Sequence, residues 1–340
     1  MKAAILHSAD SVPVYGDFDE PPTDAGYQLA ELVAAGIHQL TRSTATGRHY
    51  SRGGVFPVIP GLNAVARTAE GTLVFTSSAP PPFGTFAERI ASPDAMRFPL
   101  PSGASPEAVA AGVNPGMGSW LPLTAYRAAG GKLGTVLILG ATGITGYLGV
   151  QNARLLGATR VIGVGRSAER LARAAAAGAD TVALTSSRED DVAALAAAFA
   201  DEPPTLILDF LWGPVAETAF HALAACRLGD DGPAIRHVQV GALAGLDAAV
   251  PSALLRSTNI TISGSGAGSV SGAEIKAKIP DYIKLIADGS VDIPFRTFPL
   301  TQAGEALDGF RRPGPPRSPR PRLRCLRDGL AVLHCFGPDK

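Results

Sequence analysis

The fold is decided by the stretch TVLILGATGITG, residues 135–146. Its first five residues are apolar, as in a parallel strand that is buried on both faces. Three glycines and other small residues follow, and then comes the helical pattern YLGVQNARLLG of residues 147–157. The sequence therefore predicts a strand, a tight turn and a helix in direct succession.

The same alternation continues along the chain. Further strands are predicted at RVIGV (160–164), TVAL (181–184), LILDF (206–210) and HVQVG (237–241), with helical patterns between them. Alternating strands and helices are typical of an α/β fold with a doubly wound parallel sheet. We expect this domain to span residues 119–263.

The glycine turn is a candidate binding site for a dinucleotide. Small residues let the backbone approach a pyrophosphate, and the helix N-terminus offers free amides to the phosphates. Glycines can alternatively do no more than permit a turn, but the strand, turn, helix and second strand favour binding. The residues predicted to contact the cofactor here are Gly140, Ala141, Thr142, Gly143, Ile144, Thr145 and Gly146.

The end of the second strand indicates which dinucleotide is bound. Proteins that bind NAD place an acidic residue about twenty positions after the glycine loop. This chain has Gly165, Arg166 and Ser167 there, with Arg170 close behind. A guanidinium and a hydroxyl suit a 2′-phosphate, so we predict NADPH. The alternative is that Arg166 is only a solvated residue at a helix start.

Residues 1–118 have a different character. Short strands separated by Gly and Pro are predicted, the clearest being Lys2–Leu6, Tyr27–Ala35, Thr72–Phe75 and Phe86–Ile90. Another helix is expected over residues 273–289, with Pro280 inside it.

Composition excludes several classes of protein. The 340 residues are 46% apolar and 18% charged, with a formal net charge of zero, which predicts a two-domain globular protein. Neutral charge gives no reason to bind nucleic acid or a membrane surface. No signal peptide or membrane span is expected, and the three cysteines form no CxxC pair, which favours the cytoplasm.

The last segment, residues 311–340, is atypical. It holds eight basic and two acidic residues. The whole chain has 30 basic and 30 acidic residues, so residues 1–310 hold 22 basic and 28 acidic ones. The run RRPGPPRSPRPRLRCL has neither a helical nor a strand period. We predict a disordered or out-of-frame end, the alternative being a basic arm for an anionic partner.

Residues 1–310 resemble the medium-chain dehydrogenase/reductase superfamily, quinone oxidoreductase branch. The motifs that carry the resemblance occur in order: MKAAIL (1–6), AAGIHQLTRSTATGRHY (34–50), FPVIPG (56–61), PLTAYRAAG (122–130), GATGITG (140–146), VQVGA (238–242) and ITISGSGAGS (260–269). The resemblance implies a GroES-like, β-rich catalytic domain from residues 1–118, completed by 264–310, beside a Rossmann domain. It also implies a C-terminal strand for the first domain, which the divergent sequence after residue 310 is expected to lack.

Related alcohol dehydrogenases bind a catalytic zinc ion, but this chain departs from their pattern. It has Ala35 and Gly36 in the first ligand region, and Leu62 and Asn63 in the second. The four-cysteine zinc lobe is missing as well. Scattered histidines such as His38 and His49 are more often surface or hydrogen-bonded residues than ligands. No metal is predicted.

The resemblance also implies the chemistry and its residues. NADPH would deliver hydride to a quinone or an α,β-unsaturated carbonyl. Tyr50 would orient the substrate or donate a proton, unless it only packs. Asn114 would bind the substrate carbonyl, unless it caps the next helix, and Thr124 would anchor the carboxamide. Residues expected against the nicotinamide half are Gly241, Ala242, Ser265 and Gly266.

Two other functions remain open. One is a 2-enoyl thioester reductase, and the other is an NADPH-binding redox sensor or structural protein without turnover. No GxSxG or YxxxK motif points to another class of enzyme. The family also implies a homodimer, formed here through the edge strand NITISG (259–264).

Overall fold

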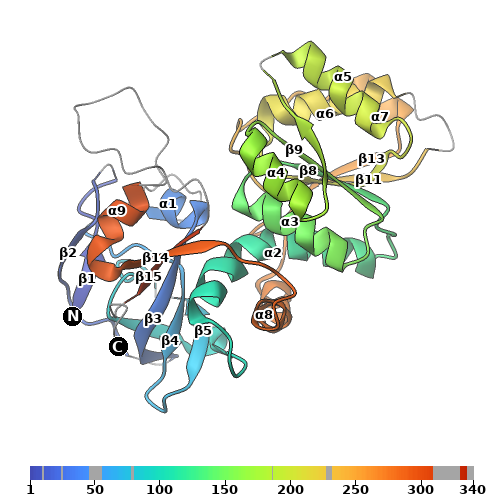
Figure 1. Cartoon of the computed structure of the whole chain (residues 1–340). Helices are drawn as coiled ribbons and strands as arrows, with labels where there is room; N and C mark the ends of the chain where they lie inside the picture. The colour runs from blue at the N-terminus through green and yellow to red at the C-terminus, as the bar shows by residue number, and fades with distance from the viewer. Residues whose placement is uncertain are drawn as a thin grey trace. The chain divides into compact units, whose positions relative to one another are not determined.

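The structure is a computed structural model that describes residues 1–9, 11–23, 26–45, 56–77, 80–185, 187–226, 232–308 and 330–334. Its contacts form two compact units, drawn in Figure 1. One consists of Met1–Asn114 with Ile279–Lys340, and the other of Pro115–Lys278. The first contains a mostly antiparallel sheet and the second a parallel sheet, so the predicted α/β fold class is confirmed.

The unit Pro115–Lys278 is built on a parallel sheet. Within the described residues it has six strands in the order β10-β9-β8-β11-β12-β13. The strand β8 lies inside the sheet, and the chain adds strands outward from it in both directions, as a doubly wound sheet requires. The bounds are β8 (Thr135–Leu139), β9 (Arg160–Gly165), β10 (Asp180–Ala183), β11 (Pro204–Asp209), β12 (Ile235–Gln239) and β13 (Ile260–Gly264).

Helices cover both faces of this sheet (Figure 1). Every residue of β8 is buried. Val136 and Ile138 pack in one cluster with residues of α3 and α4, while Leu137 and Leu139 pack in another with residues of α5, α6 and α7. Burial on both faces explains why VLIL (136–139) is continuously apolar. The bounds are α3 (Ile144–Leu155), α4 (Ala168–Ala176), α5 (Arg188–Phe199), α6 (Gly213–Ala225) and α7 (Ser252–Ser257).

The other unit is β-rich. In the part of the chain that the structure describes, seven strands form its larger sheet, in the order β14-β15-β3-β4-β5-β7 with β6 also paired to β3. The bounds are β3 (Tyr27–Ile37), β4 (Asn63–Arg67), β5 (Leu73–Ser77), β6 (Arg89–Pro93), β7 (Phe98–Pro99), β14 (Phe295–Pro299) and β15 (Leu330–His334). The helices are α1 (Gln39–Ala45), η1 (Asp94–Met96), α2 (Pro106–Ala128), α8 (Gly272–Ala287), η2 (Leu300–Gln302) and α9 (Ala303–Asp308), of which α2 and α8 continue across the boundary between units.

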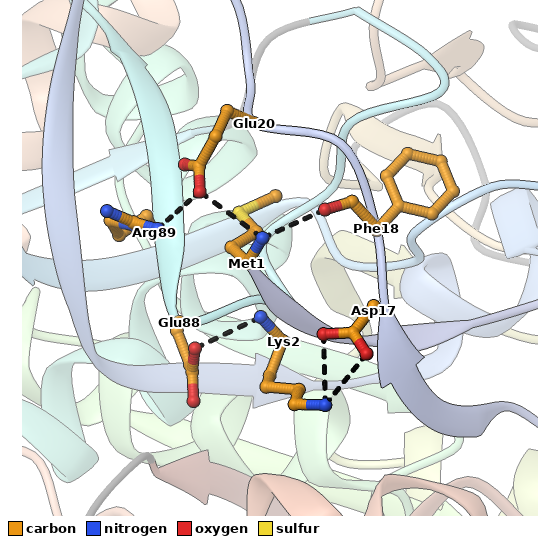
Figure 2. A network of polar contacts seen from close by, with 7 residues as sticks. All are labelled: Met1, Lys2, Asp17, Phe18, Glu20, Glu88 and Arg89. Carbon is orange, nitrogen blue, oxygen red and sulfur yellow. Dashed lines mark hydrogen bonds and ion pairs between the residues drawn. The ribbon is translucent and has the colours of Figure 1, made fainter.

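A separate hairpin joins β1 (Lys2–Ile5) to β2 (Val14–Asp17). Lys2 Nζ lies 2.9 Å from Asp17 Oδ1 across this hairpin. Glu20 lies 3.2 Å from the amino group of Met1 and also pairs with Arg89 of β6, so one carboxylate joins two segments (Figure 2). The side chains of Lys2, Asp17, Glu20 and Arg89 are exposed, so the pairs between them contribute little to stability.

The expected absence of a C-terminal strand is wrong for residues 330–334. They form β15, which pairs in parallel with β14 and antiparallel with β3. Val332 and Leu333 are fully buried there. The apolar LAVLH segment supplies ladder partners that Ala34–Ile37 of β3 would otherwise lack. Residues 311–329 and 335–340 of the predicted tail lie outside the described residues.

The alternative that Asn114 caps a helix is also wrong, because Asn114 lies inside α2. The helix continues through Pro115 and Pro122. A proline removes one helical hydrogen bond, but buried side chains such as Val113 and Met117 fix the helix on both sides of Pro115. None of the described helices combines the length and apolar character that crossing a bilayer requires.

Candidate functional site

The predicted cofactor residues of the unit Pro115–Lys278 gather at one edge of its sheet. The carboxyl ends of parallel strands meet at a single edge, and ligands of doubly wound sheets bind there. Gly140 follows β8, Gly165 ends β9, Gly241 follows β12 and Ser265 follows β13. Four segments that are far apart in sequence therefore reach the same edge.

The glycine turn is shaped by its backbone. Gly140 has φ +99°, a conformation that disfavours any side chain. Its N–H and that of Ala141 both donate to the carbonyl of Val164, at 3.0 and 2.9 Å. A Cβ on Gly146 would lie 2.3 Å from the carbonyl oxygen of Gly140. Only glycine lets the first turn of α3, which begins at Ile144, lie so close to the end of β8.

The residues predicted to select the 2′-phosphate adjoin this turn. A Cβ on Gly165 would lie 2.3 Å from the Cγ2 of Thr142, so the end of β9 contacts the turn directly. Arg166 is exposed, Ser167 is the N-cap of α4 and Arg170 lies in its first turn. Among the residues that the structure describes, neither arginine is held in an ion pair. Their charges are thus available to an anion.

An acid–base pair that the sequence analysis missed organises the neighbouring loop. Asp209 and His237 are fully buried, and His237 Nε2 lies 3.0 Å from Asp209 Oδ2. The other oxygen of Asp209 accepts from the backbone N–H groups of Leu211 and Trp212, at 2.8 and 2.7 Å. Trp212 has φ +55°, which is unfavourable outside glycine, so Asp209 stabilises a strained turn.

That turn touches the predicted cofactor segments. A Cβ on Gly140 would lie 3.1 Å from the Cγ of Leu211. The carbonyl oxygen of Asp209 accepts from the N–H of Gly241 at 3.1 Å. Asp209 therefore holds two segments at the sheet edge: the turn after β11, through its side chain, and the segment after β12, through its backbone carbonyl. The signal in the sequence was an acidic residue inside the apolar run LILDF, which a buried strand tolerates only with partners.

The other predicted residues of this unit have simpler surroundings. Thr124 Oγ1 donates to the carbonyl of Trp120 at 2.8 Å, so toward a ligand its oxygen can act only as an acceptor. Ser265 N donates to Gln239 O at 2.9 Å, and Gly266 N donates to Ser269 Oγ at 2.8 Å. Ala242 is exposed.

The predicted substrate residues belong to the other unit. Asn114 Nδ2 donates to Asn63 Oδ1 at 3.2 Å, which joins α2 to the start of β4. His38, between β3 and α1, is only 3% exposed. Burial lowers the pKa of its imidazole from 6.5 to about 4. A histidine directly after the apolar segment AAGI (34–37) is the sequence signal of a buried polar group at this position. Tyr50 and His49 lie outside the described residues.

Known proteins resemble this chain over most of its length. Residues 145–288 match the family described as zinc-binding dehydrogenase. A probable NADPH-dependent quinone reductase of Emericella nidulans is 28% identical over an alignment of 329 residues. The match covers 84% of this chain and 90% of that protein. The quinone oxidoreductase of Thermus thermophilus, solved also with NADPH, shares 24% identity with a TM-score of 0.75, over 98% of this chain and 100% of the other. A 2-haloacrylate reductase shares 19% identity with a TM-score of 0.75, over 98% and 99%.

The name of the matched family raises the question of zinc. Protein zinc sites use Cys, His, Asp or Glu ligands, usually three or four together. Over the described ranges, no three such residues are grouped so that they could hold a metal ion. The side chain in contact with the imidazole of His38 is the hydroxyl of Thr41, 3.3 Å from Nδ1, and a hydroxyl is a poor zinc ligand. The described residues do not fit a catalytic zinc ion. They do fit NADPH, since the glycine turn leaves room that a Cβ would fill and two unpaired arginines adjoin it.

Proposed function

This chain has the fold and the sequence features of a medium-chain dehydrogenase/reductase of the quinone oxidoreductase-like branch, and on that premise we propose that it is an NADPH-dependent oxidoreductase. Its substrates are small molecules with a quinone or an α,β-unsaturated carbonyl. The observation that carries the proposal is the glycine turn at the sheet edge, with Arg166 and Arg170 beside it. Relatives named for quinone reduction and for NADPH support it.

Each part of the site has a role in this proposal. Bound NADPH supplies a hydride, and water supplies the proton that completes the reduced product. The amides at the start of α3 bind the pyrophosphate, and Arg166, Ser167 and Arg170 bind the 2′-phosphate. Asn114 binds the substrate carbonyl, and no metal takes part. Tyr50 remains a candidate for orienting the substrate.

The cofactor is tested by titrating the protein with NADPH and with NADH, followed by fluorescence. Replacing Arg166→Ala is expected to weaken NADPH binding about 10- to 100-fold, because charge-assisted hydrogen bonds to the phosphate are lost. Binding of NADH, which lacks that phosphate, should not change. Arg256→Ala, an exposed arginine of the same unit, is the control and should affect neither cofactor. Equal affinity of the wild type for both cofactors would contradict the proposal.

Turnover distinguishes the remaining functions. NADPH consumption with 1,4-benzoquinone or an enone is the expected result. Consumption with enoyl thioesters alone would favour a 2-enoyl thioester reductase. Tight NADPH binding without any turnover would favour a redox sensor or a structural role.

We also propose that the protein is a homodimer and that it lies in the cytoplasm. The strand β13 ends the described part of the parallel sheet, and one side of its backbone has no neighbour among the described strands. Its apolar, β-branched residues favour pairing with a second copy. Light scattering at micromolar concentration should give twice the 34.8 kDa chain mass. A monomer would contradict this.

A further inference from the structure

The carboxylate of Asp209 lies inside the unit Pro115–Lys278 and contacts three N–H groups. It is fully buried at the end of β11. Its Oδ1 accepts from the backbone N–H groups of Leu211 and Trp212, at 2.8 and 2.7 Å, and its Oδ2 lies 3.0 Å from Nε2 of His237. Two of these groups belong to the turn that the carboxylate organises. Among the described residues, His237 of β12 is the one partner of the carboxylate from outside that turn.

The position of the proton on the imidazole follows from its burial. His237 is fully buried, and its Nδ1 has no hydrogen-bond partner among the described residues. A proton on Nδ1 would be a buried donor without an acceptor, whereas a proton on Nε2 reaches a carboxylate oxygen. His237 therefore donates its Nε2–H to Asp209.

Two aromatic rings hold the imidazole in this orientation. The centroid of the His237 ring lies 5.0 Å from that of Phe220 in α6 and 5.9 Å from that of Trp212, with interplanar angles of 41° and 76°. Trp212 and Phe220 also form an edge-to-face pair at 6.2 Å. An imidazole packed in this way has little freedom to turn, so Nε2 is a fixed point toward which Asp209 is oriented.

The turn after Asp209 needs such a support because its backbone is strained. Trp212 has φ +55°, a conformation that side chains other than glycine rarely adopt. Gly213 follows with φ +56°, and a Cβ on it would lie 2.8 Å from the Cα of Gly245. The two hydrogen bonds from the turn to Asp209 stabilise this conformation, and without them it would relax toward a commoner one.

The turn contacts both segments on which cofactor binding is proposed to depend. The side chain of Leu211 packs against Gly140, where an added Cβ would lie 3.1 Å from the Cγ of Leu211. The carbonyl oxygen of Leu211 accepts from the N–H of Ala244 at 2.8 Å, in the segment that follows Gly241 and Ala242. A displaced turn would therefore disturb the glycine turn and the segment after β12 together.

We infer that His237 is a positioning residue for the cofactor, which acts through Asp209 on the turn at Leu211 and Trp212. This rests on the proposed function, in which the glycine turn binds the dinucleotide. The N–H of His237 orients the carboxylate, the carboxylate holds the turn, and Leu211 keeps Gly140 in place. The glycine turn binds the pyrophosphate, which NADPH and NADH share. Loss of His237 should therefore weaken the binding of both cofactors by the same factor.

Two substitutions separate positioning from packing. His237→Gln places an amide N–H close to the position of Nε2, whereas His237→Leu fills the space without a donor. Leu195→Ala is the control, because Leu195 of α5 is fully buried in the hydrophobic cluster that contains Phe220 and has no side-chain group that could bond Asp209. The Kd for NADPH, the Kd for NADH and the thermal midpoint are measured for each protein.

The inference predicts a different result for each variant. His237→Leu should raise the Kd for NADPH and the Kd for NADH alike by about 10-fold, because Asp209 loses the donor that orients it. His237→Gln should keep the wild-type Kd values. Leu195→Ala should lower the thermal midpoint and leave both Kd values unchanged.

Three results would overturn the inference. They are wild-type Kd values in His237→Leu, a loss in His237→Gln equal to that in His237→Leu, and an equal loss in Leu195→Ala, which would make the effect one of general destabilisation. The wild-type protein offers a test that depends on no variant. Nitrogen NMR of its histidine rings should show His237 protonated on Nε2, and a proton on Nδ1 alone would contradict the inference.

Failure of the proposed function gives a different result. A wild-type protein that binds neither NADPH nor NADH would contradict the proposed function, and the inference with it. A wild-type protein that binds both cofactors equally would contradict the choice of NADPH but leave the role of His237 intact.

Discussion

Gly146 leaves no room for a side chain in the glycine turn. A methyl group there would lie 2.3 Å from the carbonyl oxygen and 2.7 Å from the carbonyl carbon of Gly140, and backbone atoms cannot move aside cheaply. Gly146→Ala should therefore lower the free energy of unfolding by about 2 kcal/mol and weaken NADPH binding. Gly272→Ala is the matched control, because nothing lies within 4 Å of its added Cβ. Urea titrations of both variants test this, and equal stabilities would contradict it.

The burial of His38 predicts that the protein loses stability at acid pH. The folded protein holds the pKa of His38 near 4, against an ordinary value of 6.5. Between these values the unfolded state binds a proton that the folded state refuses, so the free energy of unfolding falls as the pH is lowered from 6.5 to 4. This residue should account for on the order of 3 kcal/mol. His38→Asn does not titrate and should lose less stability between pH 7 and pH 4 in urea titrations; identical losses would contradict the prediction.

Gly146 and His38 also show which features of single residues can be predicted from the sequence. The glycine turn was predicted because its strand, turn and helix are contiguous and each leaves a local pattern. The partners of Asp209 were not, since His237 and Asp209 meet only after two strands pair side by side. The burial of His38 likewise depends on distant segments, which no local pattern encodes.

Among elements, the loop after β11 depends most on a single side chain. Asp209→Ala would leave His237 and the N–H groups of Leu211 and Trp212 without their buried partner. Leaving these buried hydrogen-bonding groups unsatisfied should cost at least about 3 kcal/mol in total and displace the turn against Gly140, so NADPH binding should weaken too.

Asp180→Ala is the control for that substitution. Asp180 belongs to the same unit and pairs with Arg160 at 2.7 Å, but its side chain is 61% exposed. Losing this pair should cost less than about 1 kcal/mol. Chemical denaturation of the two variants gives the comparison, and similar losses would show that the Asp209 pair adds nothing beyond a surface pair.

The strands of the β-rich unit were harder to predict than those of the parallel sheet. Residues 136–139 of β8 (VLIL) are all apolar because both faces of the strand are buried, and this pattern is easily recognised. The strand β4 has the sequence NAVAR, whose small residues do not by themselves predict a strand. Its place in the sheet is fixed by pairing with β3 and β5. The strand β15 follows an Arg- and Pro-rich run, which drew attention away from the apolar LAVLH.

At the scale of the whole molecule, the unit formed by Met1–Asn114 and Ile279–Lys340 depends on β15. Leu333→Ala should lower the free energy of unfolding by about 2–5 kcal/mol, since Leu333 is fully buried in the core of that unit. Leu246→Ala is the matched control, because Leu246 is 84% exposed and should matter little. A midpoint for Leu333→Ala equal to that of the control, in thermal unfolding, would show that β15 contributes no stability.

The position of β15 has a consequence for biosynthesis. The unit Pro115–Lys278 is one continuous piece of chain, so it can begin to fold as soon as the ribosome has released it. Its neighbour is in two pieces, and the last strand of its sheet, β15, begins at residue 330, whereas β3 ends at residue 37. At typical elongation rates this strand is translated roughly 15–60 s after β3. During that interval Ala34–Ile37 lack the strand that later pairs with them on this side. Chaperones that shield nascent strands should therefore associate with the first hundred residues until translation has passed residue 334.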